Sequence, residues 1–242
     1  METEARLTNP RLLKEGLRAQ QLAQDWENVE EKPRERPSTI AVIGLLIAFV
    51  GPELRELVHA HGLRAFEFGE AYYWALTVIM IAFVLAVERR PLSSIGLSAP
   101  TWRSLAWGAA AGLVVAFGTG VTYGVIFPIL HLTINKSAMA QIMAMPYWLR
   151  LLLVLRAAVF EEVVYCGYMI ERLSDLTGKR IWSGAIAWGA FTLVHIFYWG
   201  AAQMVVAGFA GLILTALYLW RRDLACNMVA HFFTDGLAFL VG

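Results

Sequence analysis

The sequence has few charges and very few cysteines. Only 16% of its 242 residues are charged and 58% are hydrophobic, whereas soluble domains have about 25% charged and about 45–50% apolar residues. Twenty basic and 19 acidic residues leave a net charge of +1, so no excess of positive charge favours nucleic acid. The two cysteines, Cys166 and Cys226, stand in apolar stretches, which argues against a disulfide scaffold. With a mean hydropathy of +0.57, the composition predicts an integral membrane protein.

The chain begins with a polar segment, residues 1–37, which holds seven basic and eight acidic residues. It starts with acidic residues and lacks the apolar core of a signal peptide. An apolar stripe from Asn9 to Val29 predicts a helix outside the membrane. This helix is either solvated with no special role, docked on the membrane surface, or bound to a partner. Residues 30–37 form a charged, proline-broken linker.

Seven hydrophobic runs follow this segment. At about 20 residues per crossing, they predict an all-α membrane bundle of about seven transmembrane helices, with a range of six to eight. The first run is short, and the third is long enough to be tilted or broken near Gly118 and Gly120. Gly108 and Gly112 form a GxxxG pattern, which allows close helix packing. The runs are Thr39–Val50, Ala71–Val87, Leu105–Leu130, Tyr147–Tyr168, Ile181–Trp199, Ala202–Trp220 and Leu224–Val241.

The basic residues between these runs alternate from one side to the other. With seven crossings, fifteen of the 20 Lys and Arg residues fall on the side of the N-terminus and three on the opposite side. Because cytoplasmic loops are enriched in Lys and Arg, the alternation predicts a cytoplasmic N-terminus and an outside C-terminus.

Three of the runs carry ionisable residues within their apolar sequence. Glu161 and Glu162 stand in the fourth run and His195 in the fifth. His231 and Asp235 stand in the seventh, four residues apart and therefore on one helical face. A charge at the bilayer centre costs about 2.5–3.5 kcal/mol, so each needs a partner or a purpose. Counting about 1.5 Å per residue puts them at similar depths, where they could meet in one pocket.

Such a pocket favours hydrolysis by water. A carboxylate in a low-dielectric site, next to a second carboxylate, becomes a general base able to take a proton from water. One histidine can share that proton, and a second imidazole can stabilise the oxyanion of an acyl-transfer reaction. Cys166 shares no helical face with a histidine and is expected to pack as a small hydrophobe.

Other interpretations of these residues remain open. Intramembrane histidines also form hydrogen bonds that hold helices together. Sets of carboxylates and histidines also form proton or transport pathways. No pair of broken segments suggests the inverted repeats of a transporter. Histidine and glutamate bind zinc, but HExxH is absent and His231 with Asp235 is the one pair at ligand spacing on one helix. We predict no cofactor, with zinc as the alternative.

The ordered set of motifs resembles the CPBP family, the CAAX proteases and bacteriocin-processing enzymes also called the Abi family. Its first motif is two glutamates, three residues, an arginine and often a glycine, which Glu161 to Gly167 match except for Cys166 at the arginine. The second, Phe-x-x-x-His, is met by Phe191 and His195. The third, His-x-x-x-Asn or Asp, is met by His231 and Asp235. The resemblance covers about residues 100–240.

The resemblance implies an endopeptidase related to the type II CAAX prenyl endopeptidase, without an essential catalytic metal. Glu161 would activate water together with His195, and Glu162 would support the site. His231 and Asp235 would form the oxyanion hole, and Phe191 of the second motif is assigned to substrate binding.

Two departures from the motifs suggest a second function. Cys166 removes the arginine that would pair with Glu162, and the carboxylate of Asp235 would repel an oxyanion unless it is protonated or instead orients His231. A catalytically inactive relative that acts as a membrane scaffold or immunity protein is therefore the alternative.

The expected organisation is a cytoplasmic segment (1–37), two membrane spans with their loops (38–100) and a protease-like membrane core (101–242). The expected partners are the lipid bilayer and a membrane-associated peptide or protein substrate, with no nucleic acid. The expected location is the bacterial inner (plasma) membrane.

Overall fold

The computed structural model describes residues 39–55 and 63–241. The chain divides into two units, residues 1–36 and 37–242, and the helices below belong to the second. The helix predicted from Asn9 to Val29 lies outside the described residues.

The regular elements in the described part of the chain are all helices, and this part contains no strand, which confirms the all-α fold class. Three elements, η2, η4 and η5, are π-helical turns, and η3 is a 3₁₀ turn. In order, the elements are α3 (Thr39–Leu54), α4 (Leu63–Ala82), η2 (Phe83–Val87), η3 (Leu92–Ile95), α5 (Trp102–Val121), η4 (Thr122–Ile126), α6 (Phe127–Ile129), α7 (Lys136–Met143), α8 (Tyr147–Glu161), η5 (Glu162–Met169), α9 (Ile170–Thr177), α10 (Arg180–Trp199), α11 (Gln203–Arg221) and α12 (Leu224–Phe239).

Local sequence signals set several helix ends. Thr101 and Ser104 form a capping box at the start of α5, which satisfies backbone N–H groups of the first turn. The side chain of Asp223 accepts a hydrogen bond from the backbone N–H of Cys226 and caps α12. Gly178 ends α9 with a φ of 66°, a left-handed conformation that glycine adopts without steric cost.

Every predicted hydrophobic run is largely helical, but the number of membrane crossings stays a prediction. In the part of the chain that the structure describes, four continuous helical segments are long and apolar enough to cross a membrane: Phe66–Val87, Trp102–Ile129, Arg180–Trp199 and Gln203–Arg221. Lys136–Met143 and Tyr147–Thr177 meet at a bend of 119° and together would make a fifth. The helix of the third run is unbroken at Gly118 and Gly120, and its irregularity is the π turn at Thr122–Ile126.

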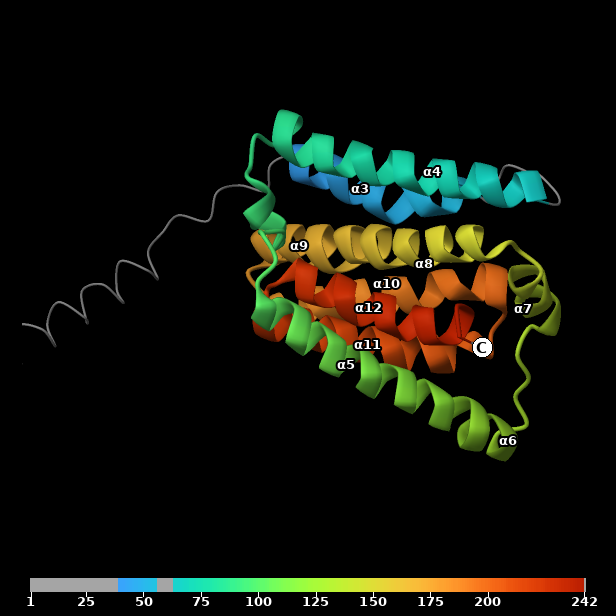
Figure 1. Cartoon of the computed structure of the whole chain (residues 1–242). Helices are drawn as coiled ribbons and strands as arrows, with labels where there is room; N and C mark the ends of the chain where they lie inside the picture. Colours follow the sequence, from blue (N-terminus) through green and yellow to red (C-terminus); the bar gives the residue numbers. More distant parts are fainter. Residues whose placement is uncertain (1–38, 56–62, 242) are drawn as a thin grey trace, which may run out of the picture. The chain divides into compact units, whose positions relative to one another are not determined.

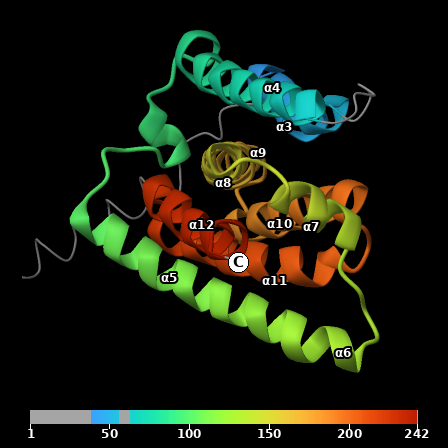
Figure 2. The same cartoon turned by 45° about the vertical axis from the view of Figure 1, so that its right-hand side comes forward.

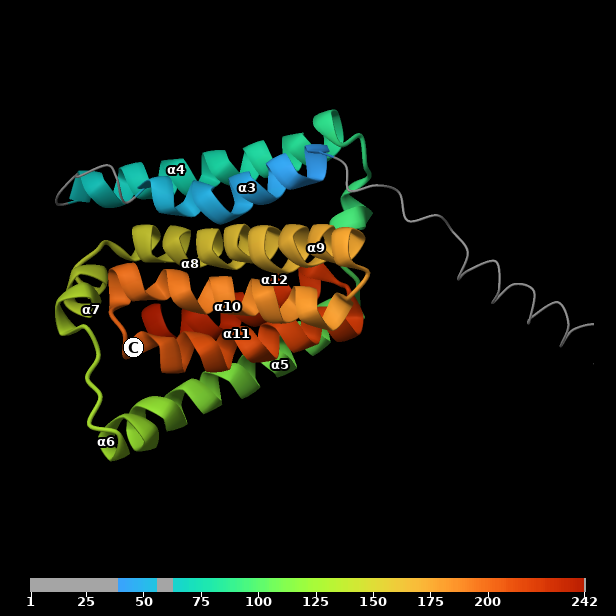
Figure 3. The same cartoon turned by 180° about the vertical axis from the view of Figure 1, so that it is seen from behind.

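The helices pack around a central rod formed by α8, η5 and α9. Helices α3 and α4 lie on one side of this rod, and α10, α11 and α12 lie on the other (Figures 1 and 2). The view from behind in Figure 3 shows the same order, with α5 beyond α11 and α12. All eight residues of η5 are buried, so the segment that begins with Glu162 lies at the centre of the core.

The predicted GxxxG contact joins α5 to α12, the helix that carries His231. A Cβ atom at Gly108 would lie 2.5 Å from the carbonyl oxygen of Cys226, and one at Gly112 would lie 2.6 Å from that of Ala230. Both distances are shorter than a van der Waals contact, so only glycine allows this approach of the two backbones.

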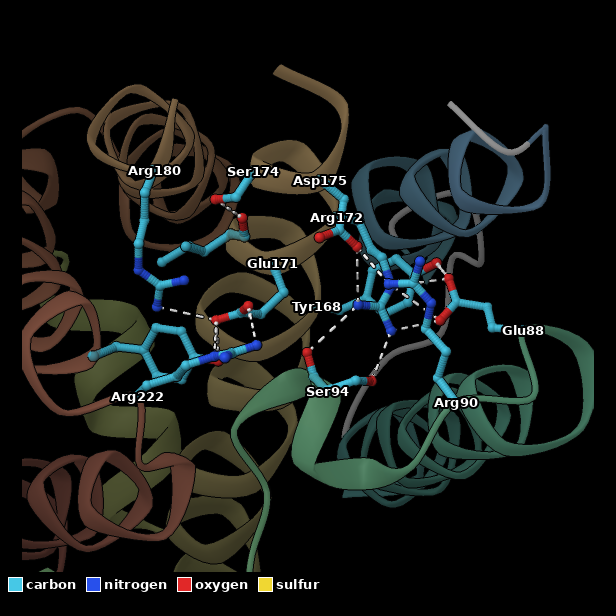
Figure 4. Close-up of polar contacts among 12 residues, drawn as sticks. Glu88, Arg90, Ser94, Tyr168, Glu171, Arg172, Ser174, Asp175, Arg180 and Arg222 are labelled. Carbon is cyan, nitrogen blue, oxygen red and sulfur yellow. Dashed lines mark hydrogen bonds and ion pairs between the residues drawn. The ribbon is translucent and has the colours of Figure 1, made fainter. Parts of the chain in front are cut away.

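A network of ion pairs surrounds α9 (Figure 4). On one side Arg172, which is 1% exposed, pairs with Glu88 at 2.6 Å between Nη2 and Oε2. On the other side Glu171 pairs with Arg180 at 3.0 Å and with Arg222 at 2.7 Å. These contacts join α9 to η2 on one side and to α10 and the end of α11 on the other, and so fix the rotation of the central rod.

Candidate active site

A cavity of about 250 Å³ lies among α4, α5, α7, α8, α10, α11 and α12. The structure brings five of the six predicted site residues to its lining: Glu161, Phe191, His195, His231 and Asp235. They come from α8, α10 and α12 and are separated by up to 74 positions in the chain, from Glu161 to Asp235. The sixth, Glu162, lies behind the cavity wall and contacts α12.

The two adjacent glutamates point into different surroundings, because successive residues of a helix point about 100° apart. Glu161 is the last residue of α8, and Glu162 is the first residue of the π-helix η5. The side chain of Glu161 is 16% exposed, while that of Glu162 is 2% exposed. Short π-helical segments inside longer helices occur frequently at functional sites.

Glu162 is held by two residues of α12. Its Oε1 lies 2.9 Å from His231 Nδ1, and its Oε2 accepts a hydrogen bond of 3.0 Å from Asn227 Nδ2. Asn227 is completely buried, and the same Nδ2 donates to the carbonyl oxygen of Leu214 at 2.8 Å. The carboxylate therefore has a partner on each oxygen, as a buried charged group requires.

His231 stands among three carboxylates. Its Nδ1 faces Glu162, while its Nε2 lies 3.5 Å from Asp235 Oδ2 and 3.8 Å from Glu161 Oε2. An ionised carboxylate oxygen accepts hydrogen bonds and never donates them. Both ring nitrogens face acceptor oxygens, so a proton on each nitrogen gives the most favourable contacts. In that form His231 is a positively charged donor at the cavity wall.

His195 lines the cavity, and one of its two ring nitrogens is bound within α10. Its Nδ1 lies 2.7 Å from the carbonyl oxygen of Phe191, one turn earlier on α10. Because a carbonyl only accepts, Nδ1 carries the proton, and Nε2 of the neutral ring has a free lone pair. The ring of Phe191 packs against both His195 and His231, with centroid distances of 4.7 and 6.3 Å.

Arg156 is the cation beside Glu161. Its Nη1 lies 3.4 Å from Glu161 Oε1, and its Nε lies 3.3 Å from Glu70 Oε1 on α4. Arg172 of α9 instead binds Glu88 in the network around α9. The first motif has an arginine where this chain has Cys166. Neither Arg156 nor Arg172 supplies that missing positive charge to Glu162.

The position of the motif arginine is filled differently. Cys166 belongs to the π-helix η5, about one turn after Glu162. Its sulfur lies 3.7 Å from Asn227 Nδ2. A neutral amide from α12 therefore makes the contact with Glu162.

Sequence reasoning missed two residues of this arrangement. Asn227 stands four residues before His231 and so shares its helical face, a spacing that could have revealed it. Glu70 immediately precedes the second hydrophobic run. Its burial results from the packing of α4 against α8, a contact that the sequence alone does not indicate.

The arrangement of the side chains also bears on whether the site could bind a metal ion. Within residues 39–55 and 63–241, no three or more His, Cys, Asp and Glu side chains are grouped so as to hold a metal ion. The expectation that the protein works without a cofactor stays a prediction.

The sequence of this core matches one known family. The model for the type II CAAX prenyl endopeptidase Rce1-like family matches residues 142–237, a range that runs from the end of α7 to the last turns of α12. No curated protein and no solved structure matches the chain.

Proposed function

Because the Rce1-like family model matches residues 142–237, we propose that this chain is a CAAX protease of the CPBP family, an intramembrane endopeptidase that uses Glu161 and a histidine to activate water. One observation carries the proposal. Glu161, His195 and His231 come from three helices and line a single cavity, while Glu162 holds His231 from behind.

The groups in the cavity suffice for peptide hydrolysis. Glu161 takes a proton from a water molecule, with Nε2 of His195 as the second acceptor, and the hydroxide attacks the peptide carbonyl carbon. The protonated Nε2 of His231 donates to the oxyanion that forms. The proton held by Glu161 or His195 then passes to the amide nitrogen, the C–N bond breaks, and an amine and a carboxylic acid are released.

Asp235 has a role that differs from direct oxyanion binding. Its carboxylate lies on the Nε2 side of His231, where it keeps the ring protonated and oriented. Phe191 supplies an apolar wall beside both histidines, against which a substrate side chain would pack.

A second candidate function is that of a catalytically inactive scaffold or immunity protein. The observation that favours it is Cys166, which stands where the first motif has an arginine. In this case the cavity would bind a peptide without cleaving it.

The substrate and setting follow from the same proposal. The cavity opens among apolar helices, so the substrate is a membrane-associated peptide or protein segment, and the lipid bilayer is the other partner. The distribution of Lys and Arg favours a cytoplasmic N-terminus, and the proposed location is the bacterial inner membrane.

The test is cleavage of a library of peptides and membrane-protein segments by purified protein in liposomes. We expect cleavage by the wild type that is lost in Glu161→Gln. Glu67→Gln is the matched control, because Glu67 is an exposed residue of α4. Binding of a peptide that survives Glu161→Gln, with no cleavage by the wild type, would favour the scaffold.

A further inference from the structure

Helix α4 contributes to the cavity although it lies outside the range matched by the family. Phe66, Glu70 and Tyr73 of α4 line the cavity together with Glu161. The sequence patterns assigned no function to residues 38–100. The contribution of α4 to the site therefore has to come from its contacts with the residues of the core.

The link between α4 and Glu161 is Arg156. Its guanidinium lies between two carboxylates, with Nε 3.3 Å from Glu70 and Nη1 3.4 Å from Glu161. The same group lies over the ring of Tyr73, 4.8 Å from the ring centroid. A planar guanidinium held on its edge by a carboxylate and on its face by an aromatic ring has a defined orientation.

This arrangement fixes the second carboxylate in turn. Arg156 Nη1 is near Oε1 of Glu161, and His231 Nε2 is 3.8 Å from its Oε2. Glu161 is thereby held between a cation on its own helix and one on α12. Rotation of this side chain would separate it from both.

A contribution to the stability of the fold does not by itself explain why a glutamate is buried at position 70. The residue is 6% exposed, and its Oε2 has no hydrogen-bond partner among the residues that the structure describes. A buried ion pair often stabilises a protein no more than apolar residues of similar volume would. An incompletely satisfied carboxylate in a cavity wall is better explained by what it holds in place.

We propose that Arg156 is a positioning residue for Glu161, and that Glu70 of α4 acts through Arg156. The inference rests on the proposed endopeptidase function. In this arrangement α4 anchors the guanidinium, and the guanidinium sets the direction in which the Glu161 carboxylate faces the cavity.

The experiment measures kcat, KM and the midpoint of thermal unfolding for Arg156→Met, Arg156→Lys and Glu70→Gln in liposomes. Because a misplacement of about 1 Å can cost about 10²-fold in rate, we expect Arg156→Met to lower kcat by about 10²-fold with KM within about twofold. Arg156→Lys keeps the charge but loses the planar fork, so it should recover part of kcat. Arg150→Met is the control, because Arg150 lies on α8 and contacts Phe239 rather than Glu161.

The double variant tests whether Glu70 acts through Arg156. If it does, Glu70→Gln combined with Arg156→Met loses no more kcat than Arg156→Met alone. The inference is overturned if the two losses multiply, if Arg156→Met has the kcat of the wild type, or if Arg156→Lys is as slow as Arg156→Met. Wild-type protein that cleaves nothing removes the proposed function and this inference with it, whereas the preceding outcomes leave the function standing.

Discussion

His231 Nδ1 and Glu162 Oε1 lie 2.9 Å apart, although the two residues are 69 positions apart in the chain. The contact joins the buried π-helix η5 to α12 and turns Nε2 of the imidazole toward the cavity. It assigns to the second glutamate of the pair a separate task from that of Glu161. Glu161 faces the cavity, and Glu162 holds the histidine that faces it.

Glu162→Gln should therefore slow cleavage without changing the shape of the site. Glutamine keeps the volume but cannot balance a protonated imidazole, so the donor for the oxyanion is weakened. We expect kcat to fall by about 10²-fold or more, measured beside the thermal midpoint. A variant with full activity would show that the charge of Glu162 is dispensable.

Cys166→Arg should not increase activity. An arginine at this position would enter space that completely buried Asn227 occupies, and overpacking costs about 1–3 kcal/mol. We expect a lower unfolding midpoint and less cleavage. Asn227→Ser, added to Cys166→Arg, should recover part of both because it makes room beside Glu162. A silent wild type that becomes active on Cys166→Arg alone would instead identify a disarmed protease.

Gly108→Ala and Gly112→Ala should each destabilise the protein and reduce activity. Each new Cβ would lie within 2.6 Å of a carbonyl oxygen of α12, so α12 must move away from α5 and carry His231 with it. We expect a loss of about 1–3 kcal/mol in detergent unfolding. Gly120→Ala is the control on the same helix, because no atom lies within 4 Å of the added Cβ. Equal effects at all three positions would exclude the packing explanation.

Arg172→Met should lower stability far more than its distance from the cavity suggests. It leaves Glu88, whose side chain is 4% exposed, without its charged partner, which costs about 3–5 kcal/mol. Glu88→Gln added to Arg172→Met should restore part of the loss, because the stranded charge is removed. Unfolding by denaturant measures both. An unchanged Arg172→Met protein would show that the network around α9 contributes nothing to the fold.

Cleavage should persist in the presence of a metal chelator. The proposed chemistry uses carboxylate and imidazole groups alone, so chelation should leave kcat within about twofold. Activity that disappears with the chelator and returns with zinc would replace this mechanism by metal-assisted hydrolysis. The assay uses the same liposomes and the same peptide library.

The local features of the chain were predictable because they depend on neighbouring residues. Hydrophobic runs longer than about 17 residues become helices in any apolar environment, and the spacing of Gly108 and Gly112 marks a close helix contact whichever partner it meets. The same holds for His231 and Asp235, which share a face because they are four residues apart. Ionisable residues within apolar runs likewise pointed to Glu161, Glu162 and His195.

Contacts between distant helices could not be predicted in this way. Nothing near Glu70 indicates that its carboxylate meets Arg156, and the break from α-helix to π-helix at Glu162 has no sequence signal of its own. The contact of Asn227 with Glu162 depends on both the packing of α12 on the central rod and the small side chain at Cys166. The sequence by itself determined an all-α membrane chain with a set of ionisable residues inside its apolar runs. Only the tertiary structure decided which of them face the cavity, because the direction of a buried side chain depends on the helices that pack around it.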